Sequence, residues 1–559
     1  MKKETFENFV EVADARLYGT SKRRTIFFKA MTSVLALNML TLGMTPAAYG
    51  SVLGSMAVDG KVAAGTYTGL DAGTFLDAGD DITVGTAATD KSVFQTSGKW
   101  EITGGKLTAP GNIFLLAGGG LTFSGGTIDV GGLVAAAMNG FEFDTTYKPD
   151  DVSGDVTVSG TSITAGYKVF IGQNVTGADG TILETRGITA KDTGDVTFSV
   201  ADNGATITFV NAKITEGNIN ADTVNFGDGG EVGKKDESTA ANINADTIKL
   251  NTGKELTQSG GTIDTSKIEG AITQSGGTIK NAAGTGDVTI SGKLTQNAGE
   301  ISADKLTVAG GSSVAGTVNA GTITITGTDG LAASGAINAG EIQGAVTQWG
   351  GTIKGANGTG DVTIGGALTQ TGGAIDASTL TLGADSDVAG TVNVDTVAAG
   401  TTTLKVSGNA DVNVTETLTA GTLDVDGGAV DAKNITATVD QDGGTITVTE
   451  TITGNVDVAG DASTLKAAKV DGALTQHAGT VGEASEALEV TGALTQNGGT
   501  INADTLTLKG GATQTAGKID ANTLAFDSEA ADVSLTSDQN DFDTIKGNAK
   551  NVKLVDANA

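Results

Sequence analysis

The chain has no cysteine, only three prolines and few aromatic residues, which make up 4% of its 559 residues. Without cysteine it has no disulfides, which is compatible with a passenger that crosses a periplasm unfolded. Little proline argues against a proline-rich linker, and the 85 glycines follow no Gly-X-Y period, which excludes a collagen. A compact core of this length would hold more large apolar side chains, so the composition favours one long array of repeats.

Positive charge is also scarce, with 34 Lys and Arg against 65 Asp and Glu and a formal net charge of -31. Such a surface cannot neutralise phosphates, so we expect no nucleic-acid partner, and docking on anionic membranes is disfavoured. The single histidine, His477, is the only residue on which a histidine-based serine triad could be built. We therefore predict no catalytic residues, no cofactor and no metal, and a structural rather than enzymatic function.

The start of the chain has the pattern of an export signal. Four positively charged residues between Lys22 and Lys29 precede the apolar run Ala30–Met44, and small residues follow up to Gly50. The run has the length of a signal-peptide core and is short for a membrane span. We predict that residues 1–50 are a signal peptide with an extended positively charged region, and that the protein is secreted or displayed on a bacterial surface.

One short motif recurs along the chain. Relatives of LTQSGGTI begin at Leu256, Ile272, Leu294, Val346, Leu368, Leu474 and Leu494, with weaker copies at Val439 and Ala512. Many are followed by a segment like INADTL, and close copies are about 16 to 22 residues apart. A larger block is duplicated as well, because Glu269–Val318 resembles Gln343–Val392 with an offset of 74 residues. A short period with β-type alternation is typical of a solenoid.

We therefore predict an all-β fold, a right-handed parallel β-solenoid whose repetitive part spans residues 211–559. Apolar residues such as Leu294, Ile301, Leu306 and Val308 should point inward, with Thr and Asp pointing out. The Gly-Gly or Ala-Gly pair of each motif should form a corner that needs positive φ. The motif glutamines, such as Gln274 and Gln296, are expected to form amide ladders between rungs.

The position after the motif glutamine is predicted to face water, because its occupants are mostly polar. They are Ser259, Ser275, Asn297, Trp349, Thr371, His477, Asn497 and Thr515. Trp349 is then either an exposed contact residue or a ring lying flat on a neighbouring rung. We take Trp349 as the candidate contact site of the chain.

Residues 51–210 carry most of the Phe and Tyr, which indicates a better packed domain that caps the solenoid. Within it, the run Ile102–Asp144 resembles the secretion domain of filamentous-haemagglutinin-type exoproteins. Its GKLTAPGNIFL, from Gly105, is similar to the family's G-x-[IL]-x-A-x-G-x-[VI]-[FY]-[LI], and its DVGGLVA, from Asp129, is similar to V-x-V-G-G-L-V-A-S. Thr161–Ile182 resembles the next rungs of that family. Where the family has Asn-Pro-Asn-Gly, this chain has Ala117–Gly120.

The resemblance implies two-partner secretion, in which an outer-membrane transporter pore exports an adhesin-like β-helix that meets a host or neighbouring-cell ligand. Two other functions stay open, a polysaccharide-acting β-helix enzyme and an S-layer or sheath subunit. The acidic pairs Asp80–Asp81, Asp150–Asp151 and Glu529 with Asp532 are interpreted as solvated turns. Stacked outward aspartates, such as Asp264, Asp376 and Asp520, could bind cations weakly.

Overall fold

The structure is a computed structural model that describes residues 51–137 apart from 68, 97, 118–119 and 131–132, and the strands that lie between 156 and 226. It also describes 229–557 apart from 235–239, 282–285, 357 and 359. For Leu116, 120–125 and the strands between 131 and 222 only the backbone is described, with the side chains of Ile214 and Ile219 in addition. The predicted signal peptide, 1–50, lies outside the described residues. The chain forms two compact units, Met1–Asp264 and Thr265–Ala559, and the predicted boundary at 210/211 falls inside the first.

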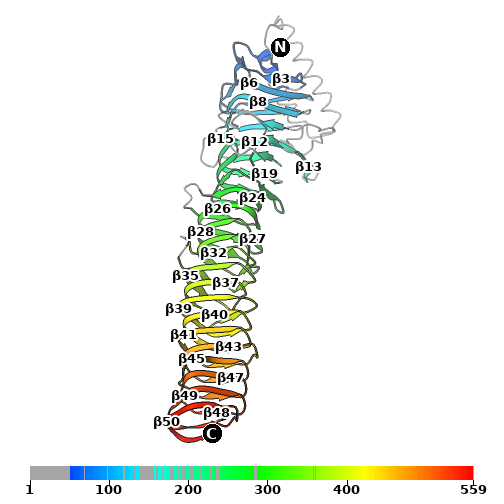
Figure 1. Ribbon diagram of the computed structural model, residues 1–559. Helices are drawn as coiled ribbons and strands as arrows, with labels where there is room; N and C mark the ends of the chain where they lie inside the picture. Colours follow the sequence, from blue (N-terminus) through cyan, green and yellow to red (C-terminus); the bar gives the residue numbers. More distant parts are fainter. Residues whose placement is uncertain are drawn as a thin grey trace. The chain divides into compact units, whose positions relative to one another are not determined.

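Each unit is a parallel β-solenoid, which confirms the predicted fold class (Figure 1). Strands pair in parallel with the equivalent strand one rung later, and one antiparallel pair joins β12 (Lys168–Thr176) to β13 (Ile182–Arg186). The described part of the chain contains a single short helix, α3 (Val52–Met56), and no helix there is long and apolar enough to cross a membrane.

The first unit begins with an aromatic cluster. Its first strands are β1 (Lys61–Val62), β2 (Thr66–Tyr67), β3 (Gly73–Leu76), β4 (Asp81–Val84), β5 (Lys91–Thr96), β6 (Lys99–Ala109), β7 (Asn112–Ala117), β8 (Gly120–Val130) and β9 (Leu133–Ala137). Phe75 packs against both Phe94 and Trp100, with ring centroids 5.5 and 4.4 Å apart, and Tyr67 stacks on Phe94. Trp100 is fully buried and its indole Nε1 donates to the Asp71 carbonyl at 2.8 Å. The aromatic-rich start is therefore a packed core, as expected for a cap.

Two glycines of the segment from Gly105 to Leu115 stand where a side chain would clash with the backbone. Gly105 has φ +80°, and a Cβ there would lie 2.1 Å from the Asp77 carbonyl oxygen. A Cβ at Gly111 would lie 2.1 Å from the Asp90 carbonyl oxygen. Both positions exclude a side chain because the preceding rung approaches too closely. The side chains of Leu107 and Ala109, on alternate positions, and of the consecutive Ile113, Phe114 and Leu115 are all buried.

A rung of the second unit has three faces, illustrated by β31 (Val346–Gln348), β32 (Thr352–Lys354) and β33 (Val362–Ile364). The next rung repeats them with β34 (Leu368–Gln370) and β35 (Ala374–Leu382), and β31 pairs with β34, β32 with β35 and β33 with β35. We call the face that contains β31 and β34 the glutamine face. Along each strand the side chains alternate between interior and solvent, as period two requires.

Aliphatic columns fill the interior. Leu294, Ile301, Leu306 and Val308 are all at most 1% exposed, as predicted. In-register pairing places like on like, for example Ile353 on Ile375 and Ile375 on Val392. Burial of each such side chain contributes about 1.5–3 kcal/mol, and it requires the neighbouring rung.

The duplicated block forms the same contacts twice. The glutamine pair Gln274 and Gln296 in the first copy corresponds to Gln348 and Gln370 in the second, with amide–amide distances of 2.9 and 3.0 Å. In both copies a serine hydroxyl one rung later accepts the backbone N–H of the leucine that begins the second motif, at 3.0 and 3.1 Å. Repetition of sequence is thus repetition of a local hydrogen-bonding pattern.

Candidate functional site

The motif glutamines lie inside the solenoid and fix its corners. The side chain of Gln348 is fully buried, and its Nε2 donates to the Gly351 carbonyl at 3.4 Å and to the Ala374 carbonyl of the next rung at 3.1 Å. The same bond to the carbonyl three residues later recurs at Gln258, Gln274, Gln296, Gln370, Gln441, Gln476, Gln496 and Gln514. Each glutamine therefore holds one turn closed and joins it to the following rung.

In the second unit the predicted amide ladders form where glutamines occupy successive rungs. Gln514 donates to Gln496 at 2.8 Å, and Gln496 donates to Gln476 at 3.1 Å. The ladders stop where valine takes the next position in the column, as Val314 does after Gln296 and Val388 after Gln370. At those ends the buried Oε1 of Gln296 and Gln370 has no hydrogen-bond partner among the described residues.

The second residue of each Gly-Gly or Ala-Gly pair has positive φ, which confirms the predicted corner. Gly351 and Gly373 have φ +64° and +86°, and Gly299 has φ +91°. A Cβ on Gly351 would lie 1.9 Å from the Gly335 carbonyl oxygen of the rung before. The first residue of the pair does not have positive φ, which explains why Ala298 and Ala478 are tolerated there.

The position after each motif glutamine faces solvent, as predicted. All eight occupants are exposed: Ser259, Ser275, Asn297, Trp349, Thr371, His477, Asn497 and Thr515. Trp349 is 63% exposed, the highest value among the large hydrophobic residues that the structure describes as exposed. The other four are Val58, Ile545, Val552 and Val555. The indole thus points outward into solvent and is not part of the core.

Trp349 is held by a rigid corner. Its backbone N–H donates to the Ala333 carbonyl at 2.8 Å, and the Gln348 carbonyl before it accepts the Thr371 N–H at 2.8 Å. Gly350 and Gly351 follow it, and Gly372 and Gly373 follow Thr371 on the next rung. The residues that follow the indole at this corner and its successor therefore bring no side chains beside the ring.

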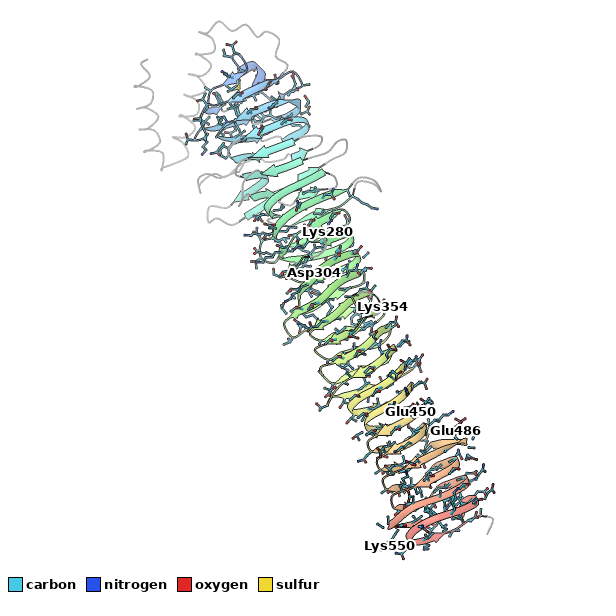
Figure 2. All side chains as sticks on the ribbon, turned by 90° about the vertical axis from the view of Figure 1, so that its left-hand side faces the viewer. Lys280, Asp304, Lys354, Glu450, Glu486 and Lys550 are labelled. Carbon is cyan, nitrogen blue, oxygen red and sulfur yellow. The ribbon has the colours of Figure 1, made fainter. Side chains whose placement is uncertain are left out.

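Outward side chains on the glutamine face change character along the second unit. Hydroxyl and methyl groups come first, on residues Thr273, Thr295, Ser313, Ala332, Thr347 and Thr369, which are paired in register. The column then continues with Asp387, Lys405, Asp424, Asp440 and Asp457. Elsewhere in this unit charged side chains such as Lys354, Glu450 and Glu486 stand on the outside of the ribbon (Figure 2).

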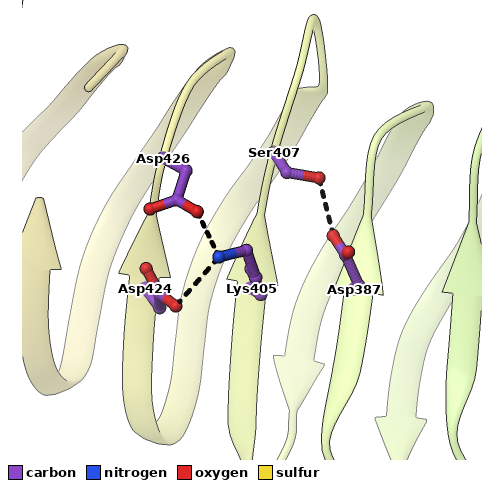
Figure 3. Close-up of polar contacts among 5 residues, drawn as sticks. All are labelled: Asp387, Lys405, Ser407, Asp424 and Asp426. Atoms are coloured by element: carbon purple, nitrogen blue, oxygen red, sulfur yellow. Dashed lines mark hydrogen bonds and ion pairs between the residues drawn. The ribbon is translucent and has the colours of Figure 1, made fainter. Parts of the chain in front are cut away.

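Lys405 is the centre of the charged part of this column (Figure 3). It lies on β38 (Thr403–Val406), and its Nζ contacts the carboxylates of Asp426 and, at 3.5 Å, Asp424, both from the next rung. The hydrogen bond that Lys405 donates to Asp426 is the main reason that the pKa of Lys405 lies above its ordinary value. The Ser407 hydroxyl, on the same rung as Lys405, donates to Asp387 of the preceding rung at 2.7 Å.

Beyond Lys405 the carboxylates repel one another. Asp440, on β40 (Ala429–Gln441), lies between Asp424 and Asp457 in the column. Loss of solvation raises the pKa of Asp440 above its ordinary value, and the charges of Asp442, Asp424, Asp457 and Asp426 raise it further. This stretch is a local concentration of negative charge that faces solvent.

The other titratable residues singled out in the sequence do not assemble into one site. His477 is half-exposed, with its Nε2 3.5 Å from Asp457 and its Nδ1 3.4 Å from the Asn497 amide. Asp376 pairs with Lys354 at 3.3 Å and Asp520 with Lys518 at 2.6 Å, and neither is stacked directly on another of the three proposed aspartates. The described part of the chain has no group of three or more acidic, His or Cys residues placed to hold a metal ion.

The acidic pairs differ from one another. Asp80 is 7% exposed and accepts hydrogen bonds from the Ser51 hydroxyl and, at 2.9 Å, from the Asp77 N–H, so its carboxylate ties α3 to a turn. The interpretation of Asp80 as a solvated residue is therefore wrong, because protein donors rather than water satisfy its carboxylate. Asp81, Glu529 and Asp532 are exposed, and Asp150–Asp151 lie outside the described residues.

No family model matches the chain, and neither the curated proteins nor the solved structures contain a match.

Proposed function

We propose that the protein is an exported, adhesin-like structural protein that displays contact surfaces away from a bacterial cell. The observation that carries the proposal is the repeated rung, in which aliphatic columns and glutamine corners close the interior while the exposed position after the motif glutamine differs among copies. An exposed indole at one corner and a charged column farther along the same face fit a scaffold that presents several surfaces.

Export is part of the proposal. Residues 1–50 direct the chain across the inner membrane, and residues 51–210, with their likeness to haemagglutinin-type secretion domains, engage a partner pore in the outer membrane. Rung-by-rung folding from the aromatic cluster around Trp100 then favours outward movement, because each folded rung provides the template for the next.

The test compares the full chain with a chain that lacks residues 51–210, each expressed with and without a two-partner-type pore. We expect only the full chain with the pore to reach the surface or medium, and the shortened chain to stay periplasmic. Equal export of both chains would contradict the secretion role. Release of products from acidic polysaccharides would favour the enzyme alternative, and sheets or filaments of the purified protein would favour an S-layer or sheath subunit.

A further inference from the structure

One stretch of the second unit lacks charge although the chain as a whole is strongly acidic. On the glutamine face it consists of the outward side chains Thr273, Thr295, Ser313, Ala332, Thr347 and Thr369. Along the adjacent corner it consists of Ser275, Asn297, Ala315, Ser334, Trp349 and Thr371, all of which are exposed. We call these positions the neutral strip. It ends at Asp387, the register partner of Thr369.

The neutral strip combines one aromatic ring with many hydroxyl groups. Trp349 offers an indole that is 63% exposed, and Thr347, Thr369 and Thr371 carry hydroxyls on the same and the next rung. The corner hydrogen bonds of Ala333 and Gln348 hold the backbone of this region in place before any ligand arrives. A rigid site loses little conformational entropy on binding, so even a small contact surface contributes to affinity.

We propose, on the basis of the adhesin-like function above, that the neutral strip around Trp349 binds uncharged glycans. The apolar face of a pyranose ring stacks on the indole, while ring hydroxyls exchange hydrogen bonds with the Thr and Ser side chains, directly or through water. Rungs repeat at about 4.8 Å, so a linear glycan along the solenoid meets a new hydroxyl at each rung.

Charge selects against anionic glycans. The net charge of -31 and the carboxylates Asp387, Asp424 and Asp440 on the same face repel sulfated or carboxylated polymers. A protein partner would need a larger apolar patch than one indole, and Trp349 is the one large hydrophobic residue exposed among the described strip positions. A neutral polyhydroxylated ligand therefore fits the strip best.

The chain supplies its own matched control. AITQSGGTIK (271–280) and AVTQWGGTIK (345–354) are copies of one rung, with Ser275 at the position of Trp349. Trp349→Ser thus introduces the residue that the equivalent corner of the other copy already contains. The double variant Trp349→Ser/Ser275→Trp moves the indole along the strip, whereas Trp349→Ser/His477→Trp moves it to a corner beside Asp457.

The experiment titrates the full chain with hexasaccharides of β-1,4-glucan, β-1,3-glucan and α-mannan, and with oligogalacturonate as the anionic probe. Binding is followed by calorimetry and by tryptophan fluorescence, which reports on Trp349 because the only other tryptophan, Trp100, is fully buried. We expect saturable binding of at least one neutral hexasaccharide, at least tenfold weaker binding by Trp349→Ser, recovery with Ser275→Trp and none with His477→Trp.

Absence of binding to all three neutral probes, or stronger binding of oligogalacturonate, would overturn the proposal, as would binding that Trp349→Ser leaves unchanged. Adhesion of cells that display the protein is measured in parallel. Adhesion that depends on Trp349 without any glycan binding would point to a protein partner and overturn only the glycan proposal. Glycan binding by a protein that is not exported would overturn only the proposed function.

Discussion

Replacement of Gln496 by valine tests whether the buried glutamines hold the rungs together. Gln496 is the middle member of a three-glutamine ladder, donating to Gln476 and accepting from Gln514. Valine is a natural occupant of this column, at Val388 and Val458 for example, so the shape of the rung tolerates it. The variant therefore removes hydrogen bonds with little change in fold.

The matched control is Gln370→Val, at the end of a two-glutamine ladder. Both substitutions leave one buried acceptor without its donor, Gln476 Oε1 in one case and Gln348 Oε1 in the other. Gln370→Val also removes an Oε1 that already had no partner among the described residues, whereas the Oε1 of Gln496 was bonded. The difference is one unsatisfied buried acceptor, or about 1–3 kcal/mol.

Hydrogen–deuterium exchange is the suitable assay, because a long repeat array opens locally and its global unfolding need not be two-state. We expect amides of the rungs around Gln496 to exchange about 5- to 150-fold faster in Gln496→Val, beyond any change that Gln370→Val causes around its own rungs. Equal effects of the two variants, or no effect of either, would refute the reasoning that ladder position determines local stability.

Three further predictions follow from the corners and the charged column. Gly351→Ala should speed hydrogen exchange in its rung far more than Gly358→Ala does. A Cβ at 351 would lie 1.9 Å from the Gly335 carbonyl oxygen, whereas position 358 is open and only its positive φ costs about 1–2 kcal/mol. Similar exchange in the two variants would contradict the corner geometry. Asp440→Asn should raise the melting temperature at pH 7 but not at pH 3. The pKa of Asp440 is raised in the folded state, so its ionisation at neutral pH disfavours folding, and asparagine removes that cost. Scanning calorimetry that shows no gain at pH 7 would contradict this. Trp349→Ser should change stability by less than about 0.5 kcal/mol, because the ring faces solvent, and a large drop in thermal stability would place it in the core instead.

The period-two alternation and the glycine pairs were sufficient to predict the solenoid, its inward aliphatic residues and its exposed corner position. The same alternation points Gln348 into the interior together with Val346, although glutamine is uncommon among buried residues. Gln348 is buried because the Gly351 carbonyl at the closed corner needs a hydrogen-bond donor, which the Gln348 amide supplies. Regular alternation alone would have been the signal for this interior position.

The charged column could not be found from the sequence. Asp387, Lys405, Asp424, Asp440 and Asp457 are separated by 16 to 19 residues, because corner loops differ in length from rung to rung. Without the strand register, no fixed period connects them. Asp80 was misinterpreted for a related reason, since its donor Ser51 is 29 residues away and lies on another element.

Paired cysteines test the in-register stacking of rungs most directly, and the cysteine-free chain gives a clean background. Thr475 and Thr495 face each other on β44 (Leu474–Gln476) and β46 (Leu494–Gln496), about 4.8 Å apart across the sheet, which is within reach of a disulfide. Thr475 and Asn497 are two residues out of register and beyond that reach. Peptide mapping after mild oxidation should find the disulfide in the 475/495 variant and not in the 475/497 variant. The opposite result, or equal disulfide formation in both, would contradict the stacked solenoid.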